Sequence, residues 1–140
     1  MSEFVVDASV AVKWLMIEPH DAVAGRLLHA GHDLLVPDLV FVEVANALWK
    51  RVMRRETTAA SATQALQTLD SLPLQIHPSQ PLLPLAFELA ARFGRTVYDS
   101  LYLAVALLRH CPVVTADGVL YRALEQTVLR SHVLWVADVP

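Results

Sequence analysis

The stretch Phe4-Val5-Val6-Asp7-Ala8-Ser9-Val10 decides the fold, because an uninterrupted apolar run passes directly into a helical pattern. Three consecutive apolar residues, 4–6, predict a short strand that is buried on both faces. Asp7 or Ser9 can cap the helix that follows, and we expect that helix to extend to Met16. A buried strand that leads straight into a helix is the repeating unit of a parallel sheet.

The same unit recurs along the chain. Further short strands are expected at 34–36, 74–76, 113–115 and 133–135. The helices expected between them cover about 21–30, 39–55, 57–70, 82–93 and 119–126, together with an apolar helix that has Asp99 in its first turn and ends near Arg109. Short apolar strands separated by helices predict an α/β fold with a central parallel sheet covered on both faces. A chain of 140 residues without an internal repeat or linker should form one domain, residues 1–140.

The composition is more apolar than that of a typical globular domain. Hydrophobic residues make up 55% of the chain, charged residues make up 18%, and the mean hydropathy is +0.43. A surface this apolar is often covered in part by another chain, so we expect a protein partner or a homodimer. The net charge of -3 offers no overall attraction to a polyanion, so nucleic-acid binding would have to be local.

Cys111 is the only cysteine, so the chain has neither a disulfide framework nor a cysteine-based zinc site. This composition fits a reducing, cytoplasmic location. The N-terminal residues lack the basic and apolar segments of a signal peptide, and no apolar run approaches the ~18 residues that would span a bilayer. We therefore expect a protein that is not embedded in a membrane.

Four carboxylates stand out because each lies near the place where an apolar strand ends or an apolar helix begins. They are Asp7, Glu43, Asp99 and Asp117. In an open parallel sheet the functional crevice lies beyond the carboxyl ends of the strands, so these side chains can converge there. Carboxylate oxygens suit a hard cation such as Mg²⁺ or Mn²⁺, whose characteristic chemistry is hydrolysis at a phosphate. Together the four acids predict a metal-dependent nuclease.

Each acid also has an ordinary structural interpretation. Asp7 and Asp99 can be helix caps, Asp117 can be a turn residue, and Glu43 can be a solvated helix residue. For Asp38, which directly precedes a predicted helix, the capping interpretation is the one we adopt. Two carboxylates about 5 Å apart repel each other by roughly 3 kcal/mol at an effective dielectric of about 20. A bound cation would remove that repulsion, so convergence of the four acids would favour a metal site.

Three uncharged polar side chains lie close to these acids in the sequence or on the same helical stripe. Ser9 and Thr115 can orient a carboxylate or a water molecule through their hydroxyl groups, although capping or a strand-edge hydrogen bond explains them equally well. Asn46 shares a helical stripe with Glu43 and can contact substrate, or can simply face solvent.

A basic cluster lies at the C-terminal end of the helix that carries Glu43. It comprises Lys50, Arg51, Arg54 and Arg55. Basic residues are favoured at helix C-termini in any case, so by itself the cluster is typical of a solvated helix end. If the helix borders the acidic site, the same residues can bind an RNA backbone.

Four segments, in this order, resemble the PIN-domain ribonucleases, and most closely the toxins of VapBC toxin–antitoxin pairs. The segments are 5–10 (VVDASV), 37–48 (PDLVFVEVANAL), 98–106 (YDSLYLAVA) and 114–117 (VTAD). The resemblance implies a three-layer α/β/α sandwich around a parallel sheet, and a homodimer. It also implies Mg²⁺ or Mn²⁺ as cofactor, endonucleolytic cleavage of RNA, and a cognate small antitoxin as partner.

Carried over position by position, the resemblance assigns metal binding to Asp7, Asp99 and Asp117. Glu43 would be either a further ligand or the group that holds the attacking water. Ser9 and Thr115 fall in supporting positions, and the basic cluster would steer the RNA. The alternative function is a catalytically weak PIN-like domain that serves mainly as a protein-binding module.

Overall fold

The computed structural model describes residues 2–140. Its centre is a sheet of five parallel strands, β1 Glu3–Val6, β2 Asp33–Pro37, β3 Gln75–His77, β4 Val113–Thr115 and β5 Val133–Trp135. Their order in the sheet is β3-β2-β1-β4-β5. All five predicted strands are present, with ends shifted by no more than one residue. Short apolar runs are therefore a sufficient signal for β1 and β2, whereas β3, Gln75-Ile76-His77, is a more polar edge strand.

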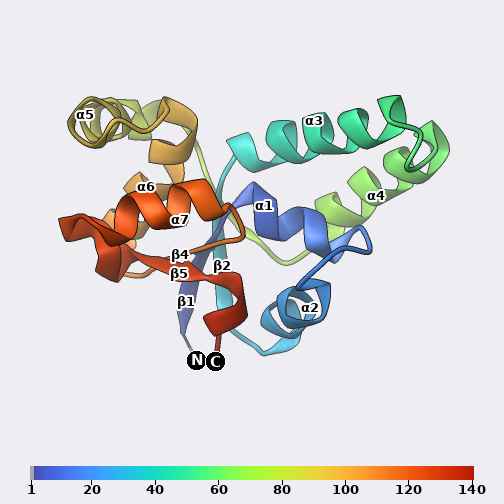
Figure 1. The fold of residues 1–140 in the computed structure, drawn as a ribbon, viewed down its shortest axis with the longest axis horizontal. Coiled ribbons are helices and arrows are strands. Elements are labelled where there is room, and N and C mark those ends of the chain that lie inside the picture. The colour runs from blue at the N-terminus through green and yellow to red at the C-terminus, as the bar shows by residue number, and fades with distance from the viewer. Residues whose placement is uncertain (1) are drawn as a thin grey trace.

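Helices pack on both faces of the sheet. Within residues 2–140 the α-helices are α1 Ala8–Ala11, α2 Asp21–His29, α3 Leu39–Met53, α4 Ala59–Ser71, α5 Leu83–Phe93, α6 Val97–Arg109 and α7 Gly118–Glu125. Short 3₁₀ helices are η1 Val12–Trp14, η2 Gln80–Leu82, η3 Val128–His132 and η4 Val136–Asp138. In Figure 1 helices α1 to α4 lie to one side of the strands and α5 to α7 to the other. The predicted α/β/α sandwich with a parallel sheet is confirmed.

The direction in which strands are added reverses beside β1. The chain builds β1, β2 and β3 toward one edge of the sheet, and then returns to place β4 on the other side of β1. Val5 pairs with Val113 and Val6 pairs with Val114, so β1 and β4 end at nearly the same level. Such a reversal point, beyond the carboxyl ends of the strands, is where open α/β sheets bind their ligands. Asp7 follows the end of β1 directly, and Asp117 follows the end of β4 after one intervening residue.

Side-chain caps define the starts of α4 and α6. Thr58 accepts a hydrogen bond from the backbone N–H of Ser61, and Thr96 accepts one from the backbone N–H of Asp99. Gly94, with φ 68°, ends α5 in the left-handed conformation that glycine adopts without steric cost. This tight turn lets α6 begin close to the end of α5, with Asp99 in its first turn.

Two helices are shorter than the sequence pattern predicts. The helix after β1 was expected to reach Met16, but α1 ends at Ala11 and continues only as the 3₁₀ helix η1. The helix expected to reach residue 55 ends at Met53, because Arg55 has φ 60°, a conformation in which a right-handed helix cannot continue.

Asp38 also differs from its predicted role. It occupies the N-cap position of α3 but makes no side-chain capping bond. Its Oδ1 instead accepts hydrogen bonds from the backbone N–H of Ser79, at 3.2 Å, and from the Ser79 hydroxyl. The capping interpretation of Asp38 is therefore wrong, because a loop that follows β3 supplies a better pair of donors.

One connected cluster of buried apolar side chains includes residues from Phe4 to Val136. The strands supply its centre, where Val5, Val6 and Leu35 have no exposed surface. Assignment of residues 1–140 to a single domain stays a prediction. None of the helices within residues 2–140 has both the length and the apolar character needed to cross a lipid bilayer.

Candidate active site

Asp7 is a buried carboxylate at the end of β1, with only 7% of its surface exposed. Its backbone N–H donates to the carbonyl of Val114 at 3.0 Å, which fixes the residue against β4. Its Oδ2 accepts hydrogen bonds from Ser9 Oγ at 2.6 Å and from Thr115 Oγ1 at 2.9 Å. Burial raises the pKa of Asp7, and the two hydroxyl donors oppose that rise. Oδ1 is left for another partner.

The two hydroxyl groups link β1 to the segment after β4. Ser9 Oγ accepts from the backbone N–H of Ala116 at 2.9 Å, and Thr115 Oγ1 accepts from that of Asp117 at 3.0 Å. A hydroxyl has a single proton, and here each one is donated to Asp7. From the sequence, capping or a strand-edge hydrogen bond explained Ser9 and Thr115 equally well. The structure places both against the Asp7 carboxylate.

Asp117 lies at the N-cap of α7. Its Oδ1 accepts from the backbone N–H groups of Val119, at 3.0 Å, and Leu120, at 3.2 Å. Asp117 thus has a structural role, but it is a helix cap rather than a simple turn residue. A cap uses one carboxylate oxygen, so the second oxygen remains available beside Asp7.

Glu43 projects from α3 and is partly buried. The hydroxyl of Tyr102 donates to Glu43 Oε1 at 2.7 Å. Burial raises the pKa of Glu43, the Tyr102 hydrogen bond opposes the rise, and the charges of Asp7 and Asp99 add to it. Burial also raises the pKa of Tyr102, and the charges of Asp7 and Glu43 add to the rise, so the phenol remains a proton donor. Glu43 is therefore not a solvated helix residue.

Asp99 lies in the first turn of α6, where Thr96 already caps the helix by accepting from the Asp99 backbone N–H at 3.0 Å. The carboxylate is therefore not needed as the cap. Burial raises the pKa of Asp99 to about 6, the charges of Asp7 and Asp117 add to the rise, and Arg95 opposes it.

The four carboxylates share one region, because the charges of some of them raise the pKa values of others. The charge of Asp117 raises the pKa of Asp7 and Asp99, and the charges of Asp7 and Asp99 raise that of Glu43. The ion pairs within residues 2–140 are Lys13–Glu18, Arg51–Glu18 and Arg109–Glu3. None of the four acids thus has a cation at ion-pair distance.

These properties suit a hard divalent cation in chemistry, because all four donors are carboxylates and none of them is in an ion pair, although the charge of Arg95 partly offsets that of Asp99. The geometry is not yet that of a metal site. In the described part of the chain, no three acidic, histidine or cysteine side chains have the spacing that holds a metal ion. Binding of a cation would require the carboxylates to move closer together.

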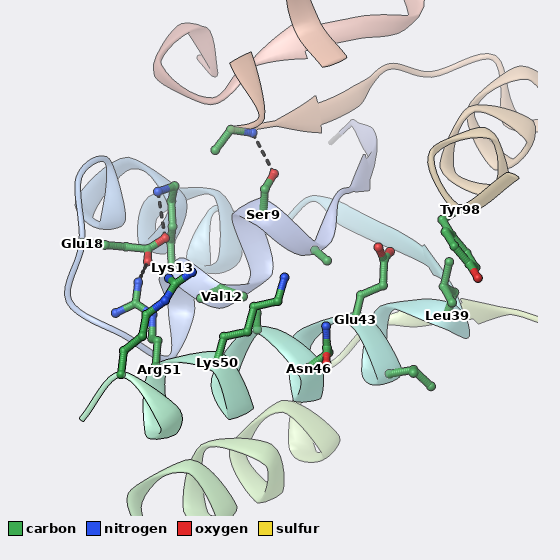
Figure 2. A pocket seen from close by; sticks show the side chains of 15 residues that line it. Ser9, Val12, Lys13, Glu18, Leu39, Glu43, Asn46, Lys50, Arg51 and Tyr98 are labelled. Atoms are coloured by element: carbon green, nitrogen blue, oxygen red, sulfur yellow. Dashed lines mark hydrogen bonds and ion pairs between the residues drawn. The ribbon is translucent and has the colours of Figure 1, made fainter. Parts of the chain in front are cut away.

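A groove of about 770 Å³ opens beside the acids, between α1, α3 and the start of α6. Glu43 lines it directly, and Figure 2 shows its carboxylate pointing away from α3 into the groove. The other three acids lie just behind the wall, which is formed in part by their chain neighbours Ala8, Tyr98 and Ala116. Ser9 and Asn46 also line the groove.

The predicted basic cluster is divided by the fold. Lys50 and Arg54 are exposed and line the groove, and Arg51 lines it too but forms an ion pair with Glu18. Figure 2 shows Arg51 directed toward Glu18 rather than toward Glu43. Arg55 is exposed but does not line the groove. The sequence pattern contains no signal for the Arg51 pair, because Glu18 lies 33 residues away.

Two further residues of the site were missed by the sequence analysis as functional candidates. Tyr102 lies one helical turn after Asp99, and that i, i+3 spacing is the signal that could have identified it. Glu18 accepts from Lys13 Nζ of η1 at 2.9 Å and pairs with Arg51 of α3, so it links the segment after η1 to α3.

The fold and the acidic edge define a class of protein. Residues 4–125 match the model of the PIN domain, and the chain belongs to the PIN-domain family.

Within that family the similar proteins are VapC ribonucleases and toxin–antitoxin complexes. The chain is 35% identical to Ribonuclease VapC3 of Pyrobaculum aerophilum over 106 residues, which cover 74% of this chain and 81% of that protein. The crystal structure of PAE2754 from Pyrobaculum aerophilum superposes with a TM-score of 0.73 at 25% identity, over 97% of this chain and 85% of that one. A toxin–antitoxin complex from Klebsiella pneumoniae superposes with a TM-score of 0.64 at 13% identity, over 96% of this chain and 98% of that one.

Proposed function

We propose that this protein is a metal-dependent endoribonuclease of the VapC kind, the toxin of a toxin–antitoxin pair. The observation that carries the proposal is the acidic edge. Four carboxylates repel one another there without a neutralising cation, beside a groove lined by Lys50 and Arg54. The VapC ribonuclease relative supports the activity, and the toxin–antitoxin complex supports the partner.

We propose that Asp7, Asp99 and Asp117 hold Mg²⁺ or Mn²⁺, and that Glu43 either joins them or holds the attacking water. A divalent cation supplies Lewis acidity, which makes water more acidic and offsets the charge that develops on a phosphate during hydrolysis. Ser9 and Thr115 keep the Asp7 carboxylate oriented by occupying its Oδ2. This neutral support leaves the negative charge of Asp7 intact for a cation.

The RNA backbone is proposed to run along the groove past α3. Lys50 and Arg54 are positioned to contact phosphates, and Asn46 can reach the same strand. Arg51 and Arg55 belong to the same cluster, but one is paired and the other lies outside the groove. Because the net charge is -3, binding depends on this local patch and should be sensitive to salt.

The proposed partners are a cognate antitoxin and a second copy of the chain, in the cytoplasm. The outer face of α3 supports a protein partner, because Val42, Trp49 and Met53 follow one helical stripe and are more than half exposed. The same stripe is the observation that favours the alternative function, a PIN-like binding module with little catalysis.

Cleavage of labelled single-stranded RNAs separates the two functions. The wild type should cut at least one member of a panel in Mg²⁺ and should cut none in EDTA. Asp99→Asn should lower the rate by about a hundredfold while the protein stays folded. Asp70→Asn, on the exposed face of α4, is the matched control and should cleave at the wild-type rate. A folded Asp99→Asn variant with wild-type activity would refute the catalytic proposal.

A further inference from the structure

Tyr102 is a buried tyrosine whose hydroxyl is committed to a single side chain. Only 1% of its surface is exposed, and its side chain belongs to the buried core cluster. Its hydroxyl donates to Glu43 Oε1 at 2.7 Å, across 59 residues of sequence. A phenylalanine would fill the same volume, so the hydroxyl serves the contact with Glu43 rather than the packing.

The hydrogen bond from Tyr102 restricts a Glu43 side chain that could otherwise adopt several rotamers. A glutamate side chain has three rotatable bonds, and this one lies beside a groove of about 770 Å³ that leaves room for other rotamers. Repulsion from Asp7 and Asp99 would also drive its carboxylate away from them. The hydrogen bond from Tyr102 fixes Oε1 and leaves Oε2 as the oxygen that can face a ligand.

The helix that carries Tyr102 also carries Asp99. The two residues are three positions apart on α6, so they project from the same face of one rigid element. Through Tyr102 the position of Glu43 on α3 is therefore set relative to Asp99. A loop could not impose that relation with the same precision.

We infer that Tyr102 is a positioning residue: its hydroxyl orients the Glu43 carboxylate, so that Oε2 stays free to bind a divalent cation when the cation draws the four acids together. This inference rests on the proposed function and deepens it, because it makes Glu43 a cation ligand rather than only a holder of water. It predicts that removal of one buried hydroxyl weakens cation binding without disturbing the groove that receives RNA.

The test is Mn²⁺ binding to the full chain, measured by electron paramagnetic resonance, together with cleavage kinetics. Tyr102→Phe should bind Mn²⁺ about tenfold or more weakly than the wild type, as expected when a group that orients a ligand is lost. Its kcat at fixed Mn²⁺ should fall, and its KM for RNA should stay unchanged. The matched control is Tyr121→Phe on α7, where the ring packs against Trp135 outside the acidic site. That control should match the wild type in both measurements.

A double-mutant cycle distinguishes positioning from a general loss of stability. In a Glu43→Ala background, Tyr102→Phe should cause no further loss of Mn²⁺ affinity, because the group it orients is absent. All proteins are compared at a temperature at which circular dichroism shows them folded.

A loss smaller than about tenfold, or an equal loss in the Glu43→Ala background, overturns the inference. Failure of the wild type itself to bind Mn²⁺ and cleave RNA would instead overturn the proposed function.

Discussion

Asp99 should make the metal-free protein less stable as the pH rises from about 4 to about 7. The pKa of its carboxyl is raised from its ordinary value of 3.8 to about 6, chiefly by burial and next by the charge of Asp7. Between these values the unfolded chain has lost the proton of Asp99 while the folded chain retains it. The folded state therefore binds more protons, and stability falls with pH across this window and levels off above it.

The size of the effect follows from the same values. A pKa change of one unit corresponds to about 1.4 kcal/mol, so the rise to about 6 would amount to about 3 kcal/mol for a fully buried group. Asp99 is partly exposed, and solvent screening reduces this to about 1 to 2 kcal/mol. For a domain of this size the change corresponds to a fall of about 3 to 8 °C in Tm.

The assay is thermal unfolding followed by circular dichroism, in EDTA, from pH 4 to pH 7.5. The difference between wild type and Asp99→Asn isolates the residue, because His77 has an opposing effect: burial lowers its pKa, which makes stability rise with pH near 6. Asp99→Asn should remove a distinct part of the fall in Tm, and the rest comes from Asp7 and Glu43, whose pKa values burial also raises. Saturating Mg²⁺ should raise the wild-type Tm most at pH 7.5. Identical pH profiles for the two proteins in EDTA would refute the reasoning.

Three further substitutions test separate contacts of the site. Thr115→Val removes a buried hydroxyl that donates to Asp7 at 2.9 Å, and should lower the free energy of unfolding in urea by about 1.5 to 3 kcal/mol; a change below about 0.5 kcal/mol would contradict the role of that bond. Glu18→Gln should free the guanidinium of Arg51, tighten RNA binding and steepen its salt dependence, whereas weaker binding would mean that the pair itself shapes the groove. Arg54→Ala should weaken binding of all RNAs alike and should lower the slope of log binding constant against log salt concentration by about one. An unchanged slope would mean that Arg54 is only a solvated residue at a helix end.

The backbone framework of this protein could be predicted from the sequence, because it depends on local patterns. Three-residue apolar runs such as 4–6 and 113–115 identify strands without reference to any other part of the chain. Asp7 and Asp117 could then be placed together, since each lies just after a parallel strand. Where the prediction failed, as for the end of the helix at Met53, a single residue with an unusual backbone conformation decided the outcome.

Side-chain partners that are distant in sequence could not be predicted in this way. Tyr102 reaches Glu43 across 59 residues, Arg51 reaches Glu18 across 33, and Asp38 is bonded by a serine 41 residues later. Each of these pairs depends on how two helices or a helix and a loop pack, and residue spacing carries no information about that. The basic cluster is the clearest case, because its members look equivalent in sequence and differ only in what the fold places beside them.

Three of the four acids share an arrangement that bears on their chemistry. In Asp7, Glu43 and Asp117 one carboxylate oxygen accepts hydrogen bonds from neutral donors, either hydroxyl groups or backbone N–H groups. A lysine or arginine in the same place would fix the carboxylate equally well but would cancel its charge. Neutral donors orient each group and leave its full negative charge directed at the space between them. The cost is mutual repulsion, which is retained in the folded protein and which, once the acids are ionised, an added cation can relieve. That is the electrostatic reason to expect metal dependence here, and it holds whichever oxygens turn out to be ligands.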